Sequence, residues 1–169
     1  MLVRILALLG ALLLGAGPAA AADWQTFTNA DYRIATSVPG APKVTIDGTP
    51  AAPKAEGRGN LAALVIVTDT RVYLLRADLY PSDASVSGRD MLNYTVDEIS
   101  TPDRGPVAYR AETTVQGYPA IDVVFGPDAD GAYIRDRVIA KDGVLVQLIS
   151  ADTSMPALDR FYTDFKFLP

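Results

Sequence analysis

The sequence predicts an α+β fold in which an antiparallel sheet of about six strands packs against two helices. Short segments alternate apolar and polar residues with period two, which is typical of strands that bury one face. Turn residues, among them Gln116-Gly117 and Asp142-Gly143, separate neighbouring segments at hairpin spacing. Two further segments carry apolar side chains with helical period, so each helix can pack one face on the sheet.

The N-terminal half is predicted to consist mainly of strands. Residues 24–27 and 32–38 alternate apolar and polar side chains, and a third strand is expected at 43–46. Residues 47–60 are rich in Gly, Pro and Ala, which indicates a loop. The apolar, β-branched run 61–67 and the segment 72–80 are joined by turn residues, and together they predict a hairpin at the centre of the sheet.

A helix is predicted over residues 88–100, between the two sets of strands. Ser87 is followed three residues later by Asp90, which resembles a capping box with Asp in place of the usual Glu. Leu92, Val96 and Ile99 recur at helical spacing and form one apolar stripe. We therefore expect this helix to pack on the sheet.

The C-terminal half predicts an antiparallel meander that is closed by a second helix. Its four strand segments are 107–115, 118–125, 132–140 and 144–150. Ser154 is suited to cap a helix that has Pro156 in its first turn. The apolar face of that helix is expected to comprise Leu158, Phe161, Tyr162 and Phe165.

Residues 1–22 are predicted to be a cleavable secretory signal peptide, followed by a single domain over 23–169. Arg4 supplies the positive charge, 5–14 is an apolar run, and the small residues 19–22 provide a cleavage site. An uncleaved membrane anchor would need roughly 20 continuous apolar residues. We expect cleavage near Ala22 and a soluble periplasmic or secreted product with no stable membrane anchor.

The composition excludes several classes of chemistry. The chain contains no histidine and no cysteine, so Ser-His-Asp and Cys-His nucleophile systems, thiolate redox chemistry, the usual zinc sites and covalent c-type haem are ruled out. The net charge of −5 argues against nucleic acid and anionic membranes as partners. Carboxylate chemistry, a Ser-Lys pair and an oxygen-ligand metal site remain.

Five short motifs follow one another in a characteristic order. They are Val38-Pro39-Gly40-Ala41-Pro42, Tyr80-Pro81, Gly117-Tyr118-Pro119, Arg135-Asp136-Arg137 and Phe161-Tyr162-Thr163-Asp164-Phe165. With the order of elements, these motifs resemble the PsbP/Mog1-like family of small exported domains over nearly the whole chain after residue 22. The resemblance implies an antiparallel sheet with packed helices and accessory roles, such as extrinsic subunits of photosynthetic complexes or partners of small GTPases. It implies no common active site, so no functional residue is carried over.

Two arginines form the candidate binding site. Arg135 and Arg137 share one face of a predicted strand with Tyr133, because side chains alternate along a strand. Two guanidiniums about 7 Å apart can bind a carboxylate, a phosphate or an acidic partner. The meander order adds Arg110 and Gln147 as the expected neighbours. The alternative is that the arginines pair with acids on adjacent strands, such as Asp122 or Glu112.

Other candidate sites have simpler structural explanations. The acids of 128–131 begin like a calcium loop, but strand residues follow them, so a hairpin turn is expected. Lys141 precedes a turn signal, and no pattern places it beside a serine nucleophile. We expect no cofactor and no metal site. A carboxylate pair suited to hydrolysis would have to come from Asp97, Glu98, Glu112 and Asp122.

The leading functional hypothesis is a soluble periplasmic accessory module that binds an envelope protein and has no catalytic role. The first alternative is a protein that binds a small ligand or lipid in a cavity between sheet and helices. The second alternative is a carboxylate-based hydrolase. A large apolar pocket would favour the first alternative, two acids in a cleft would favour the second, and an exposed surface of aromatic and arginine side chains would favour the accessory module.

Overall fold

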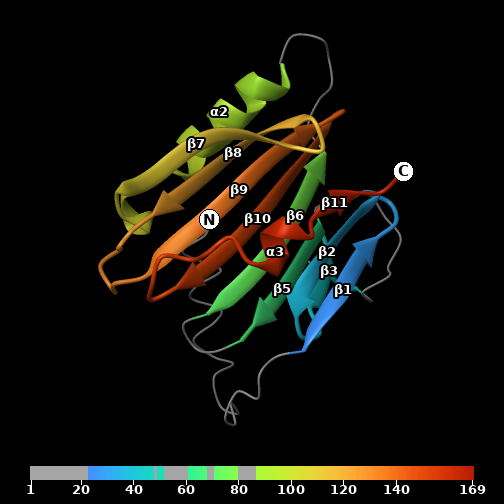
Figure 1. The fold of residues 1–169 in the computed structure, drawn as a ribbon, viewed down its shortest axis with the longest axis horizontal. Helices are drawn as coiled ribbons and strands as arrows, with labels where there is room; N and C mark the ends of the chain where they lie inside the picture. The colour runs from blue at the N-terminus through green and yellow to red at the C-terminus, as the bar shows by residue number, and fades with distance from the viewer. Residues whose placement is uncertain (1–22, 48, 52–60, 68–70, 80–86) are drawn as a thin grey trace.

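The computed structural model describes residues 23–47, 49–51, 61–67, 71–79 and 87–169, and in them two antiparallel sheets face each other (Figure 1). The larger sheet has eight strands in the order β4-β3-β5-β6-β10-β9-β8-β7, and the smaller has three in the order β1-β2-β11. The larger sheet comprises β3 (Lys43–Ile46), β4 (Thr49–Ala51), β5 (Leu61–Ile66), β6 (Val72–Leu79), β7 (Val107–Val115), β8 (Tyr118–Phe125), β9 (Tyr133–Lys141) and β10 (Val144–Asp152). The smaller sheet comprises β1 (Trp24–Asn29), β2 (Ile34–Pro39) and β11 (Lys166–Phe167).

The prediction of one sheet with about six strands is therefore wrong, because the described strands form two sheets and are more numerous. The first two predicted strands form a separate sheet, which is completed by β11 from the far end of the chain. Strand β4 lies within the expected loop 47–60. Residues 48 and 52–60 of that loop lie outside the described residues, as does the expected signal peptide. Strands as short as β4 and β11 carry too few residues to show a period.

The predicted hairpin and meander are confirmed. Strands β5 and β6 pair antiparallel in the middle of the sheet, and β7 to β10 follow one another as antiparallel neighbours. Gln116 and Gly117 have φ angles of 51° and 84°, which fits the two-residue turn that joins β7 to β8. Strand β7 ends the order and forms one edge of the sheet.

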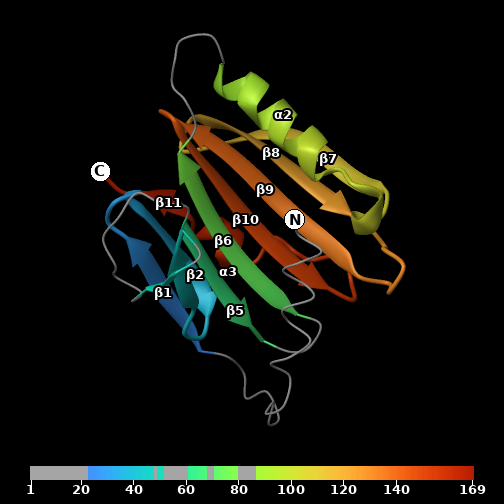
Figure 2. The same cartoon turned by 180° about the vertical axis from the view of Figure 1, so that it is seen from behind.

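Helix α2 (Gly88–Ile99) confirms the first predicted helix. The Ser87 hydroxyl accepts a hydrogen bond from the Asp90 backbone N–H at 3.1 Å, as a cap should. Leu92 and Val96 are buried against an apolar cluster from β8 and β9. Figure 2 shows α2 on the face of the larger sheet opposite to the smaller sheet and α3.

The second predicted helix is much shorter than expected. Helix α3 spans only Arg160–Thr163, and its cap is Asp159 rather than Ser154. Upstream, the backbone carbonyl of Pro156 accepts a hydrogen bond from Arg135 Nε at 2.7 Å, which holds the segment 153–159 against the larger sheet. Leu158 is 47% exposed instead of lying on a buried helix face. Phe161, Tyr162 and Phe165 are buried, as the apolar pattern predicted.

The main core lies between the two sheets. Phe161 is fully buried there, and its ring makes edge contacts with Tyr73 and Tyr162 at centroid distances of 5.2 and 5.3 Å. A second apolar cluster lies under α2 on the other face of the larger sheet. Among the described residues, no helix has the length and apolar character needed to cross a bilayer.

Candidate functional site

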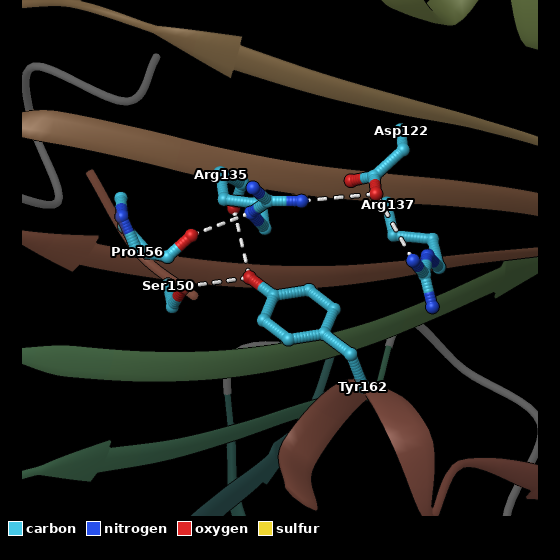
Figure 3. A network of polar contacts seen from close by, with 6 residues as sticks. All are labelled: Asp122, Arg135, Arg137, Ser150, Pro156 and Tyr162. Carbon is cyan, nitrogen blue, oxygen red and sulfur yellow. Dashed lines mark hydrogen bonds and ion pairs between the residues drawn. The ribbon is translucent and has the colours of Figure 1, made fainter. Parts of the chain in front are cut away.

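The two candidate arginines and Asp122 meet on the face of the larger sheet that points toward α3 (Figure 3). Arg137 lies directly opposite Asp122 in the pairing of β8 with β9, and Arg135 lies two residues earlier on the same side of β9. Arg135 Nη1 and Arg137 Nη2 each donate a hydrogen bond of 3.0 Å to Asp122 Oδ2. The ion-pair alternative is confirmed for Asp122. Glu112 is paired instead with Arg89 of α2, at 2.9 Å.

This cluster is buried and carries unequal charge. Arg135 is 8% exposed and Asp122 4% exposed, so solvent screens their interaction very little. One carboxylate faces two guanidiniums, which leaves a surplus of one positive charge. Asp122 Oδ1 and Arg137 Nε are buried with no hydrogen-bond partner among the described residues. Each ion therefore depends on the others, because an unpaired buried charge is costly.

Tyr162 of α3 closes the cluster from the opposite side. Its hydroxyl donates a hydrogen bond of 3.2 Å to the Arg135 carbonyl and lies 2.6 Å from the Ser150 hydroxyl. The Arg137 guanidinium lies 5.5 Å from the centre of the Tyr162 ring, within cation–π range. Burial raises the pKa of Tyr162 well above its usual value, so the hydroxyl stays neutral. The arrangement holds both arginines in place.

Exposed apolar side chains lie around this cluster. The Arg135 guanidinium sits 5.9 Å from the centre of the Tyr109 ring and also holds the carbonyl of Pro156. Tyr109 is 46% exposed, and Met155 and Leu158, which flank Pro156 and Ala157, are 51% and 47% exposed. We call Tyr109, Met155 and Leu158, which Arg135 links through the Tyr109 ring and the Pro156 carbonyl, the Tyr109 surface. Sequence reasoning missed it, because the position of segment 153–159 depends on a contact with Arg135.

The three other candidate residues differ in position. Tyr133 begins β9 opposite Asp152, is half-buried and lies two residues before Arg135, so it shares the face of β9 with the two arginines as predicted. Arg110 and Gln147 do not join Arg135 and Arg137, contrary to the expectation. In the register of the sheet they align with Val123 and Val138, whose side chains pack under α2, so both point to the opposite face.

Gln147 belongs to a second buried polar cluster that the sequence analysis did not identify. Asp136, fully buried on the α2 face, accepts a hydrogen bond from Gln147 Nε2 at 3.1 Å and lies 3.6 Å from Arg104 Nη1. Burial raises the pKa of Asp136 to about 6, against the opposing effect of Arg104. One sequence signal could have indicated this second cluster. Side chains alternate along the Arg135-Asp136-Arg137 motif, which places Asp136 and the two arginines on opposite faces of β9.

The raised pKa of Asp136 predicts that this residue weakens the fold as pH rises. The folded chain holds the Asp136 proton up to about pH 6, whereas the unfolded chain releases it near its usual pKa of 3.8. The contribution of Asp136 to the free energy of unfolding is therefore fully present below about pH 4 and is lost as pH rises through about 6. Urea unfolding of the wild type and of Asp136→Asn, from about pH 4 to about pH 7, should show their stability difference changing by on the order of 2–3 kcal/mol. A constant difference would contradict the assignment.

Neither the acids of 128–131 nor Lys141 is arranged for chemistry. Asp128 Oδ1 accepts backbone hydrogen bonds from Asp130 and Ala132, both at 2.9 Å, which confirms the expected turn. The Lys141 amine lies 4.8 Å from the centre of the Tyr118 ring and 4.5 Å from that of Phe167. Within the described part of the chain, no three acidic side chains are grouped as metal ligands.

Two shallow clefts border the smaller sheet and segment 153–159. The first, of about 210 Å³, lies between β6, β10 and that segment, and Met155 is one of the residues that line it. The second, of about 460 Å³, lies between β2 and the C-terminal segment. Polar side chains form much of its wall: Thr26, Thr36, Ser37, Gln116, Arg160, Thr163, Asp164 and Lys166.

Comparison with known proteins identifies the fold. No family model and no curated protein matches the sequence. The structure is similar to the solution structure of cyanobacterial PsbP (CyanoP) from Synechocystis sp. PCC 6803, with a TM-score of 0.54 and 12% sequence identity. The match covers 92% of this chain and 98% of that chain. The chain therefore has a PsbP-like fold, as the motif order predicted.

Proposed function

We propose that this PsbP-like chain is an exported accessory module that binds an envelope protein and performs no catalysis itself. The Tyr109 surface is the proposed contact. The observation that carries the proposal is that three exposed apolar side chains adjoin the buried Arg135, which contacts the Tyr109 ring and holds the Pro156 carbonyl between Met155 and Leu158. Aromatic side chains such as Tyr109 are among the residues that most often dominate binding energy at protein interfaces.

The residues that support the Tyr109 surface are held in place by hydrogen bonds. Arg135 is fixed by Asp122 at 3.0 Å and by the Pro156 carbonyl at 2.7 Å, so the support beneath Tyr109 and the adjacent segment is already ordered. Ordered side chains lose little further entropy on binding. The role of Arg135 is therefore to position this surface, and the nearly buried guanidinium is not the main contact.

The two alternative functions have less support. Ligand or lipid binding favours an apolar cavity, whereas polar side chains form much of the wall of the cleft of about 460 Å³. For a hydrolase, the four candidate acids are poorly placed. Asp122 is held by Arg135 and Arg137, Glu112 pairs with Arg89, and Asp97 lies on the exposed side of α2 near Arg110 with Glu98 beside it.

Export from the cytoplasm is part of the proposal. The charged, apolar and small-residue regions of 1–22 occur in the order that signal peptidase recognises. The resemblance of the fold to PsbP supports an accessory role by analogy only, because one fold serves many functions.

Site-specific photo-crosslinking in intact cells tests the proposed contact. A photoreactive phenylalanine analogue at Tyr109 or at Met155 should form an adduct with the same envelope protein, because both side chains lie on the proposed surface. The control position is Tyr94, which is 63% exposed but belongs to α2 on the opposite face. Adducts with one protein at 109 and 155, and not at 94, are expected. Equal labelling at all three positions, or none at 109 and 155, would contradict the proposal.

A further inference from the structure

Strand β7 is a long open edge of the larger sheet. It has nine residues, whereas β4 at the opposite edge has three. Among the described strands β7 pairs only with β8, and most of its residues are exposed on both faces. An edge strand presents backbone N–H and C=O groups that can pair with another chain, and natural proteins usually prevent this with charges, prolines or bulges.

The hairpin fixes which backbone groups of β7 point outward. The two-residue turn at 116–117 makes Val115 and Tyr118 the first hydrogen-bonded pair of the β7–β8 ladder. Because hydrogen-bonded and non-hydrogen-bonded positions alternate, the backbone groups of Arg110, Glu112 and Thr114 face away from β8. The ladder is regular from Tyr109 to Val115, and its irregularity lies before Tyr109. A regular stretch is thus available for pairing.

The side chains of this stretch are complementary to themselves. Arg110 and Glu112 flank Ala111 on β7. If a second copy pairs antiparallel with Ala111 at the centre, each Arg110 lies opposite Glu112 of the second copy. Centring the pair on Arg110 or on Glu112 would instead oppose like charges, which destabilises a sheet. The charges on this edge therefore favour one register and do not prevent pairing.

We propose that the β7 edge is a homodimer interface, in which two copies pair antiparallel about Ala111 through reciprocal Arg110–Glu112 contacts. In the single chain these two residues make exposed contacts with α2: Arg110 with Asn93 at 2.8 Å, and Glu112 with Arg89 at 2.9 Å. Exposed pairs of this kind contribute little and are exchanged at low cost.

The packing of α2 is compatible with the dimer. The main packing partners of helix α2 are β8 and β9 rather than β7. With strands about 4.8 Å apart, the two α2 helices would lie roughly 20 Å apart on one face of the joined sheet. The two-fold axis runs perpendicular to the sheet, so both Tyr109 surfaces lie together on the other face. A dimer would thus present the proposed contact twice.

Charge reversal tests the register. The protein is expressed from the full sequence, purified in its processed form and studied by sedimentation equilibrium. The wild type should dimerise, and Arg110→Glu or Glu112→Arg should each weaken association roughly 10- to 100-fold, because both reciprocal pairs then oppose like charges. An equimolar mixture of the two variants restores both pairs and should dimerise like the wild type. The double variant Arg110→Glu/Glu112→Arg should also dimerise like the wild type, because it restores opposite charges at both pairs.

A matched control isolates the interface from the helix contact. Arg89→Ala removes the pair with Glu112 but leaves the β7 edge intact, so it should dimerise normally. Thermal melting monitors folding of every variant. A monomeric wild type at sub-millimolar concentration, single variants that associate normally, or a mixture that stays monomeric would each overturn the proposal.

Cysteine crosslinking gives a second readout that does not depend on charge. The chain has no cysteine, so Ala111→Cys introduces a single thiol at the two-fold axis. At a non-hydrogen-bonded pair the Cα atoms lie about 4.5 Å apart, within the range of a disulfide. Oxidation should convert Ala111→Cys to a covalent dimer. Thr113→Cys is the control, because its copies would lie about four residues apart along the joined strands. Equal crosslinking at both positions would overturn the register.

Discussion

Replacing Asp122 with alanine is expected to lower the free energy of unfolding by about 3–5 kcal/mol, which is the usual effect of removing one partner from a buried ion pair. Asp122 Oδ2 accepts hydrogen bonds from Arg135 and Arg137, both at 3.0 Å, and the carboxylate side chain is 5% exposed. Without it, two guanidiniums are left close together with no counterion. Urea unfolding of Asp122→Ala near neutral pH measures the loss.

Two further variants show whether the loss arises from unpaired charge. Asp97→Ala removes an acid that is 75% exposed and 3.8 Å from Arg110, and it should cost less than about 1 kcal/mol. The triple variant Asp122→Ala/Arg135→Met/Arg137→Met leaves no charge in the cluster and should recover much of the lost stability. If Asp122→Ala unfolds like the wild type, the cluster does not have the structural role assigned to it.

The second large effect is expected for Phe161→Ala. Phe161 is fully buried between the two sheets, and its backbone carbonyl accepts a hydrogen bond from the Thr36 hydroxyl at 2.6 Å. Deleting a buried phenylalanine ring costs about 3–5 kcal/mol, from lost apolar burial and the cavity that remains. Because Phe161 anchors segment 153–159 from its C-terminal side, limited proteolysis should also cleave that segment faster. Thermal and urea unfolding measure the stability change.

Leu158→Ala is the matched control for the anchor. It also truncates a large apolar residue next to α3, but Leu158 is 47% exposed, so the expected change is within about 0.5 kcal/mol. Equal losses for the two variants would contradict the view that Phe161 anchors the C-terminal end of the segment and Leu158 does not. Photo-crosslinking at Met155 in the Phe161→Ala background would then report whether an ordered segment is needed for binding.

Local sequence patterns were sufficient to predict most of the fold. Helix α2 and strands β7 and β8 occur where cap, period and turn residues placed them, because those signals act within a few residues. Strand β11 and the extended path of 153–159 depend on distant partners: Lys166 and Phe167 pair with β2, and the segment is held by Arg135. No local pattern contains that information.

The candidate site was likewise predicted only in part. Alternation placed Arg135 and Arg137 together, and the cross-strand rule proposed Asp122 or Glu112 as their partners, of which Asp122 is confirmed. The prediction of Arg110 and Gln147 from the meander order was wrong, because strand order does not give the register. A shift of one residue in the register of β7 or β10 moves these side chains to the other face of the sheet. Tyr162 reaches the site from α3, and its position follows from packing rather than from strand order.

The buried Asp122 cluster also favours one alignment of β8 and β9. Asp122 on β8 meets Arg135 and Arg137 of β9 on the face toward α3. A shift of one residue would turn every side chain of β9 to the other face and leave Asp122 without either arginine. A carboxylate buried without a counterion is costly, so this misalignment carries an electrostatic penalty in addition to the loss of apolar packing.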